Sequence, residues 1–491
     1  MPVGPVPDLG RAAARGTAVT LGAQGVRFVL QIGSLVVLAR LLTPEAFGLV
    51  AMVTSVLGVA ELIRDFGLSS AAIQAKELSD KEQTNLFWVN VGIGTTCACL
   101  AILAASLIAT LYGDDRVRPV VVALAGMLVV SGVTTQFRAD LSRELRFSAL
   151  GVVEVVAQAS AVTVAIVAAA RGAGYWSIVA QQMTLVVTTC ALSAALSRWR
   201  PGLPSRRTSI RRFVRFGSNV LGTQVIGYAT NNADNVALGA VWGAGPLGAY
   251  SRAYQLLMVP INQVNDPMTR VVLPLLSRVH DDPAVYQRYL EKAQRVGTYG
   301  LGPLFSVAAG LAAPLVALLF GPQWTAVTPV FVALAVGGVF RGVGLVTYWG
   351  FLSSGQTGQQ LRMYLVARPV MIGIILAGLP WGPLGVAIGH STAFALYWLV
   401  SLGYLGRVTR VDRGRLFGQA VRALLTISLP AGSLAYAGTL LSGTTLLQLL
   451  YGGGLAACYL AVILLVSPAK RAELRAVRSL LQRRPAEAGA S

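Results

Sequence analysis

The sequence predicts an all-α integral membrane protein with about fourteen transmembrane helices: two six-helix lobes in a parallel repeat, plus two C-terminal helices. Composition is the first of three observations behind this fold class. Of 491 residues, 55% are hydrophobic and only 12% are charged, against roughly 25% charged residues in soluble domains. The other two observations are a series of long apolar runs and an internal repeat. Because one crossing needs roughly 20 apolar residues, most of the chain is expected to lie in lipid.

The apolar runs define the elements in order along the chain. A tail at 1–15 precedes the first run, and Pro, Gly or charged loops separate the runs from one another. The predicted spans are 16–39, 47–66, 84–111, 119–137, 149–170, 175–197, 216–241, 247–273, 297–320, 325–351, 363–380, 384–405, 421–440 and 445–467. The basic tail at 468–491 alternates Leu or Val with Arg, which is typical of a short amphipathic helix at the membrane interface.

The distribution of basic residues predicts the orientation of these spans. The chain carries 40 Lys and Arg against 20 Asp and Glu, a net charge of +20. Only four cations, Arg40, Arg116, Arg118 and Arg171, fall in the odd-numbered loops, whereas the even-numbered loops and the termini are rich in them. Cytoplasmic loops are enriched in Lys and Arg, so both termini are expected in the cytoplasm. Topology and attraction to anionic membrane lipids account for the surplus charge, and no nucleic-acid partner is expected.

An internal repeat divides the chain. A shift of 200 residues matches Arg15 with Arg215, Gln24 with Gln224 and Gly48 with Gly248. The second copy begins after an even number of spans, so both copies have the same orientation in the membrane. In transporters built from such repeats, the substrate site lies between the repeats. The predicted domains are an N-lobe at 16–197, a basic linker at 198–215, a C-lobe at 216–405 and two further spans within 406–467.

Polar residues recur every three or four positions within several spans, so they share one helix face. Polar groups facing hydrocarbon cost several kcal/mol each, and these faces are expected to line a hydrated cavity between the lobes. Hydrogen bonding across a dry helix interface is the alternative. Besides the arginines, the candidate cavity residues are Gln24 and Gln31 in the first span, Asn231 in the seventh, and Gln255 and Asn262 in the eighth.

Charged residues inside the spans are the sharpest functional candidates, because an ionised group in the membrane is costly to keep without a role. In this assignment the spans contain five arginines and five acids, so their net charge is zero. The arginines are Arg27, Arg64, Arg252, Arg270 and Arg341, and the acids are Glu61, Asp65, Glu154, Asp234 and Asp266. Arg64 and Arg270 have acids at helical spacing and can pair locally. Arg27 and Arg341 do not, so they are the first candidates for an anionic ligand, with Arg252 and Arg270 next. Guanidinium groups donate paired hydrogen bonds to phosphate.

Pairing across helices with Glu154 or Asp234 is the alternative for Arg27 and Arg341. Conversely, Asp234 and Glu154, together with Glu61 and Asp65, are candidates for binding a coupling proton or sodium ion.

Neither metal nor nucleotide chemistry is expected. Cys97, Cys99, Cys190 and Cys458 all lie in apolar runs, and the sequence holds only two His, with no metal-ligand spacing. The phosphate-binding motif GxxxxGK[ST] is also absent from the sequence. No cofactor is therefore predicted.

Two segments carry a family resemblance. Both match the sequence pattern of one transporter family at the right spacing. The first-lobe segment is ARLLTPEAFGLVAM at 39–52, followed by DFGLSSAAI at 65–73, and its second-lobe counterpart is GAGPLGAYSRAYQLLMVPINQVNDPMTRVVLPLLSRV at 243–279. The chain thereby resembles the polysaccharide-transporter branch of the multidrug/oligosaccharidyl-lipid/polysaccharide (MOP) exporter superfamily. Within it, the chain is similar to Wzx-type polysaccharide or O-antigen flippases, of the colanic-acid-exporter (WzxC-like) kind.

The resemblance implies a transporter rather than an enzyme. It implies translocation of an undecaprenyl-pyrophosphate-linked oligosaccharide across the bacterial cytoplasmic membrane, for exopolysaccharide, capsule or lipopolysaccharide assembly. Arg27, Arg252 and Arg270 would lie on the helices whose arginines hold the pyrophosphate. Alternating access would be driven by a coupled ion or the membrane potential. A polysaccharide polymerase and glycosyltransferases are candidate partners.

Two rival functions are weaker. A drug exporter of the same superfamily, coupled to ions, predicts a cavity dominated by acids and aromatic residues, whereas arginines are at least as frequent here. A polymerase or ligase needs a substantial outer domain, yet every odd-numbered loop is short.

Overall fold

The computed structural model describes residues 9–65, 78–205, 211–441 and 443–467, and every regular element in these residues is helical. The chain divides into two compact units, 1–248 and 249–491, which are described separately below. The predicted amphipathic tail at 468–491, most of DFGLSSAAI and part of the basic linker lie outside the described residues.

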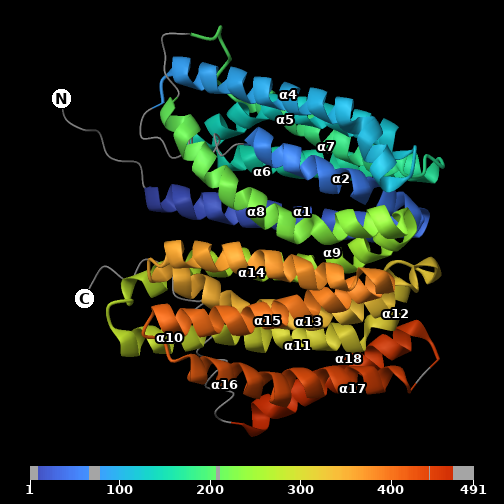
Figure 1. Ribbon diagram of the computed structural model, residues 1–491, viewed down its shortest axis with the longest axis vertical. Coiled ribbons are helices and arrows are strands. Elements are labelled where there is room, and N and C mark those ends of the chain that lie inside the picture. Colours follow the sequence, from blue (N-terminus) through green and yellow to red (C-terminus); the bar gives the residue numbers. More distant parts are fainter. Residues whose placement is uncertain (1–8, 66–77, 206–210, 442, 468–491) are drawn as a thin grey trace. The chain divides into compact units, whose positions relative to one another are not determined.

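The first unit is a bundle of long helices. α4 packs against α5, α5 against α7, and α6 against both α1 and α7, while α2 contacts α4, α5 and α8. Figure 1 shows these helices in blue to green. Their bounds are α1 Leu9–Leu41, α2 Pro44–Asp65, α4 Asp80–Tyr112, α5 Val117–Arg143, α6 Phe147–Ala170, α7 Trp176–Leu196 and α8 Arg211–Trp242.

Local sequence explains where α4 begins and ends. Ser79 caps its N-terminus: the hydroxyl accepts a hydrogen bond from the Glu82 backbone N–H, and the Glu82 carboxylate accepts one from the Ser79 backbone. Gly113, with φ of 63°, ends the helix in the left-handed conformation that glycine adopts without strain. In the short turn that follows, hydrogen bonds from Arg116 hold the pKa of Asp114 below its usual value.

The second unit contains shorter and more interrupted helices. Its core packs Tyr286, Trp349 and Leu405 together. The bounds are α9 Ala244–Arg278 (which starts in the first unit), α10 Pro283–Val296, α11 Gly302–Gly310, α12 Ala312–Leu319, α13 Val327–Ser353, α14 Thr357–Ala377, α15 Gly382–Val408, α16 Arg413–Ala423, α17 Leu429–Thr439 and α18 Thr445–Val466, with π-helical turns at Gly297–Leu301 and Leu424–Ser428 and 3-10 turns at Pro322–Trp324 and Leu379–Trp381.

One predicted span is not a continuous helix. The segment 297–320 begins with a π-helical turn, and the run that ends at Gly310 bends by 79° before Ala312–Leu319 continues. Pro260, Pro267 and Pro274 lie inside α9. Breaks of both kinds disturb the regular i to i−4 hydrogen bonding, so they are the points where these helices bend most easily.

Length and apolarity identify a multi-pass membrane protein. In the described residues, ten stretches are long and apolar enough to span a membrane, or eleven with the bent pair. One of the ten, Thr357–Val408, contains both α14 and α15. The helices α8 and α9 are long enough to span but are not among the ten, because their polar residues lower the mean hydropathy. The exact number of fourteen spans stays a prediction.

The offset of the internal repeat recurs in the helix boundaries. α1 ends at Leu41 and α2 begins at Pro44, while α8 ends at Trp242 and α9 begins at Ala244. At the start of these second helices, two matched glycines meet. A Cβ on Gly48 would overlap the backbone carbonyl of Ala244, and a Cβ on Gly248 would overlap that of Pro44. We call this the glycine contact. It brings the backbones of α2 and α9 together more closely than any side chain would permit.

Candidate functional site

An ion cluster joins three helices of the first unit. Arg27 Nη1 on α1 lies 2.9 Å from Glu154 Oε2 on α6, and Arg138 Nη2 on α5 lies 2.9 Å from Glu154 Oε1. The predicted alternative of cross-helix pairing with Glu154 is therefore what the structure shows for Arg27. The same contacts give Glu154 two partners, although the sequence left it without one. Two guanidinium groups share one carboxylate, so the cluster keeps a net positive charge.

The predicted charge balance of the spans was wrong. α5 continues to Arg143, beyond the predicted end at 137, so Arg138 and Asp140 lie within it. Arg368 lies in the middle of α14, inside the predicted span 363–380, but was left out of the five arginines. Its guanidinium carbon lies 4.9 Å from the Tyr364 ring centre and 5.4 Å from that of Tyr397. The repeating polar positions along α5, continued past 137, are the signal that could have identified Arg138.

Beside the ion cluster lies a polar cavity of about 440 Å³ between α2, α5 and α7. We call it the hydroxyl cavity. Its described lining residues are Arg64, Ser131, Thr134, Thr135, Arg138, Ala139, Ser142, Leu185, Val186 and Thr189. None of them is a carboxylate, and Arg64 Nη1 donates a hydrogen bond to Thr135 Oγ1 at 3.2 Å. Arg64 interacts electrostatically with Glu61, three positions earlier on α2, although no direct ion pair joins the two side chains among the described contacts.

Arg341 on α13 is held by aromatic residues of the second unit. Its Nη1 lies 3.4 Å from Tyr254 Oη, and its guanidinium carbon lies 4.7 Å from the Phe394 ring centre. No carboxylate of the described residues lies within ion-pair distance of it. An arginine over an aromatic face is stabilised by the ring quadrupole and can still donate hydrogen bonds to an anion. The role of Arg341 in binding an anionic ligand stays a prediction.

The remaining predicted residues occupy the predicted helices. Gln24 and Gln31 are exposed on α1, and Glu61 is exposed on α2. On α8, Asn231 is half-buried and Asp234 is buried, with its carboxylate accepting from the Asn235 backbone N–H at 2.8 Å. On α9, Arg252 and Gln255 are half-buried while Asn262 and Arg270 are exposed. The side chains of Asp65 and Asp266 lie outside the described residues.

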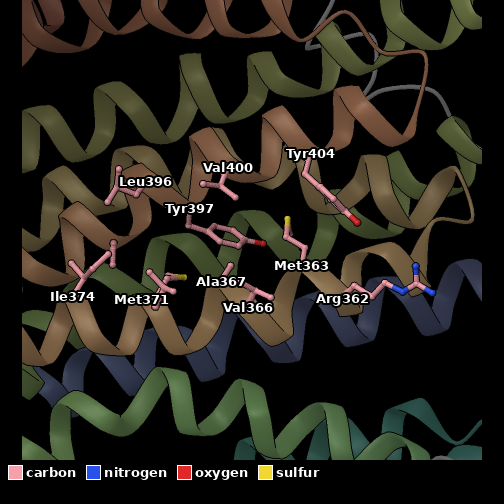
Figure 2. Close-up of a pocket in the computed structure, with 12 residues that line it drawn as sticks. Arg362, Met363, Val366, Ala367, Met371, Ile374, Leu396, Tyr397, Val400 and Tyr404 are labelled. Carbon is pink, nitrogen blue, oxygen red and sulfur yellow. The ribbon is translucent and has the colours of Figure 1, made fainter.

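An apolar groove of about 560 Å³ runs between α14 and α15. Figure 2 shows Met363, Val366, Ala367 and Met371 of α14 facing Leu396, Tyr397, Val400 and Tyr404 of α15, with Arg362 at one end and Ile374 at the other. Val370 and Ala393 complete the lining. Sequence reasoning missed this groove, because its residues are chemically the same as those of any lipid-facing helix surface.

The sequence is similar to those of proteins that assemble or transport polysaccharides, as their names state. A family model described as "Polysaccharide biosynthesis protein" matches residues 37–329. Lipopolysaccharide biosynthesis protein WzxC of Escherichia coli (strain K12) is 27% identical over 427 residues, covering 84% of this chain and 85% of that protein. Succinoglycan biosynthesis transport protein ExoT of Rhizobium meliloti (strain 1021) is 25% identical over 399 residues, covering 80% and 78% respectively.

The fold is similar to those of two solved transporter structures. The lipid II flippase MurJ in an inward closed conformation superimposes with a TM-score of 0.73 at 14% identity, covering 91% of this chain and 99% of that one. An inward-facing multidrug resistance MATE family transporter of the MOP superfamily superimposes with a TM-score of 0.61 at 15% identity, covering 82% and 98%. At these identities the likeness concerns the fold alone, and it confirms the fold of the MOP superfamily.

Proposed function

Because this chain belongs to the polysaccharide biosynthesis protein family, we propose that it is a flippase for a lipid-linked oligosaccharide. The substrate would be an undecaprenyl-pyrophosphate-linked glycan, carried from the cytoplasmic to the outer leaflet of the bacterial cytoplasmic membrane. The pathway served would be exopolysaccharide, capsule or lipopolysaccharide synthesis. Polymerases and glycosyltransferases of that pathway would be its partners.

One observation carries this proposal: three arginines of the first unit gather around one carboxylate and one polar cavity. Arg27 and Arg138 both pair with Glu154, and Arg64 lies in the wall of the same cavity as Arg138. Charged groups in membrane helices are expensive, so the retention of this arginine cluster favours an anionic ligand. A pyrophosphate supplies oxygen atoms that match the planar donor fork of arginine.

The predicted topology fits this transport. With both termini in the cytoplasm, the ends of α2 and α5 that carry Arg64 and Arg138 would lie on the side where the substrate is synthesised. The predicted lobes at 16–197 and 216–405 would then move against each other, so that the headgroup is released on the opposite side. The buried Asp234 is the candidate for binding the coupling ion.

The hydroxyl cavity does not fit the alternative function of a drug exporter. Neither a carboxylate nor an aromatic ring occurs among its described lining residues. A cationic aromatic compound would therefore meet two guanidinium groups there and no carboxylate of the described lining, which is unfavourable.

Transport can be tested in a bacterial strain whose own flippase gene has been replaced by the gene for this chain. Lipid-linked glycan should appear outside the membrane, measured by labelling intact cells with a membrane-impermeant lectin. Arg27→Ala and Arg341→Ala should insert normally in the membrane but lower that labelling at least tenfold. Labelling no higher than in the strain without the gene would contradict the proposal, and wild-type labelling with both variants would contradict the roles of the arginines.

We propose further that the apolar groove between α14 and α15 holds the isoprenoid chain of the same substrate. Arg362 and Ile374 are separated by twelve positions, which is about 18 Å along a helix, and Arg362 would lie near the phosphate end. Val366→Trp, at a lining residue that is 70% exposed, should fill the groove and slow transport several-fold. Leu365→Trp, at a neighbouring residue that is 54% exposed and outside the described lining, is the control. Equal rates in the two variants would exclude the groove as a chain site.

A further inference from the structure

We propose that the hydroxyl cavity of the first unit binds an acidic sugar of the glycan, of the hexuronate class. This inference rests on the proposed function, because it names which part of a lipid-linked glycan the cavity recognises. Three properties of the cavity walls lead to this inference: the hydrogen-bond donors of the arginines, the hydrogen bonds already made by the threonine hydroxyl groups, and an apolar side.

The arginines supply donors for a carboxylate. Arg64 enters from α2 and Arg138 from α5. The described contacts use Arg64 Nη1 for Thr135 and Arg138 Nη2 for Glu154, while the buried Nε of Arg64 has no hydrogen-bond partner among the described residues. A guanidinium carries five N–H donors, so each group retains donors for a ligand.

The three threonine hydroxyl groups of the lining supply acceptors rather than donors, whereas Ser131 and Ser142 can also donate. Thr134 donates its proton to the Val130 carbonyl at 2.7 Å. Thr135 donates to the Ser131 carbonyl at 2.9 Å, and Thr189 to the Leu185 carbonyl at 2.7 Å. A hydroxyl has only one proton to donate. Once that proton is bound to the helix backbone, the oxygen can only accept hydrogen bonds from whatever occupies the cavity.

The combination of donors and acceptors selects the ligand class. A phosphate or pyrophosphate consists almost entirely of acceptor oxygens, so it would satisfy the arginines and the serine hydroxyl groups but face the three threonine oxygens without hydrogen bonds. A sugar acid satisfies both kinds of group, because its carboxylate accepts from arginine and its hydroxyl groups donate to threonine. A neutral sugar would bring no anionic group to Arg64, the arginine of the lining that has no described ion pair.

The third property is the apolar side of the cavity. Ala139, Leu185 and Val186 line it with carbon atoms, as the C–H face of a sugar ring requires. The volume of about 440 Å³ lies within the ordinary range of small-molecule sites, which is roughly 300–1,000 Å³. Dimensions and chemistry therefore agree on a single sugar ring bearing a carboxylate.

The first experiment measures binding to the purified full-length protein by saturation-transfer NMR, with sodium glucuronate, glucose and inorganic phosphate as separate probes. Glucuronate should bind at least tenfold more tightly than glucose or phosphate. Arg64→Gln should weaken glucuronate binding at least tenfold, and Thr189→Val, which keeps the side-chain shape, should weaken it several-fold. Thr110→Val removes the same kind of backbone-bonded hydroxyl from an exposed position on α4 and should change nothing.

The outcomes separate the possible ligands. Phosphate binding as tight as glucuronate binding, unaffected by Thr189→Val, would show a plain anion site and overturn the inference. Glucose binding equal to that of glucuronate would also overturn it. If Arg64→Gln does not fold, Thr189→Val alone still decides between these results.

A second experiment distinguishes failure of this inference from failure of the proposed function. Cells expressing the wild-type chain or Thr189→Val are supplied with a lipid-linked glycan that contains a uronic acid or with its neutral analogue. The variant should export the acidic glycan several-fold more slowly than the wild type, and the neutral one at an equal rate. Wild-type export of both glycans without glucuronate binding would refute only the sugar site. Glucuronate binding without export of any glycan would refute only the flippase.

Discussion

Gly48→Val is expected to abolish the folded protein. A side chain at this position would meet the carbonyl of Ala244 and the backbone nitrogen of Gly248, and neither group can rotate away as a flexible side chain could. Helix α2 would have to move away from the first turn of α9, and this movement would also disturb the packing of α2 against α4, α5 and α8. That loss would exceed the 4–5 kcal/mol that marks exceptional substitutions, a large part of a typical stability of roughly 5–15 kcal/mol.

The measurement is the fraction of detergent-solubilised protein that elutes as a single monodisperse peak, together with its Tm. Gly248→Val should behave in the same way, because its Cβ would meet the Pro44 carbonyl. Gly245→Ala is the matched control: it lies in the same turn of α9, and nothing lies within 4 Å of an added Cβ. It should leave Tm unchanged or raise it, since alanine favours helices over glycine by about 1 kcal/mol. A Gly48→Val protein with wild-type Tm would show that the backbones are not in contact.

Glu154→Gln is expected to have the second-largest effect on stability. The substitution removes the negative charge with which both Arg27 on α1 and Arg138 on α5 form ion pairs. The two guanidinium groups then lie close together without a shared carboxylate. Hydrogen bonds to charged groups contribute about 1.5–3 kcal/mol each, and the partial exposure of these side chains lowers that figure. A loss of about 2 kcal/mol, measured as a lower Tm of the purified protein, is therefore the expected result.

A double-mutant cycle identifies the cause. Arg27→Gln combined with Glu154→Gln should destabilise the protein by less than the sum of the two single changes. Each single change already removes the Arg27–Glu154 ion pair, so the sum includes the loss of that pair twice. Glu45→Gln, whose partner Arg116 lies on an exposed turn outside the spans, should cost less than about 0.5 kcal/mol. If Glu154→Gln instead kept its Tm but abolished the pH dependence of transport, Glu154 would be an ion-coupling residue rather than a bridge between the two arginines.

The sequence could predict the features that depend on periodicity. The spacing of polar and apolar residues placed Arg27 within a long apolar helix, where the structure has it. Matching the chain to itself at an offset of 200 paired Gly48 with Gly248, which the structure brings into contact. Each of these features follows from the order of residues along one helix or from direct repetition.

The features that depend on neighbouring helices could not be predicted. Thr134 and Thr189 are ordinary small polar residues in a sequence, and only the packing of α5 against α7 places them in one cavity. Arg138 was assigned to a loop, because hydropathy falls at the polar end of α5 while the helix continues. The bend after Gly310 likewise depends on tertiary packing, since Gly310 approaches the backbone of Gly432 on α17.

The glycine contact has a reciprocal form. Gly48 approaches Ala244, and Gly248 approaches Pro44. At the offset of 200, Gly248 is the counterpart of Gly48 and Ala244 is the counterpart of Pro44. Such reciprocity is typical of an isologous interface, in which one surface patch binds a second copy of itself. A substitution at either glycine therefore disturbs the same contact from the opposite side.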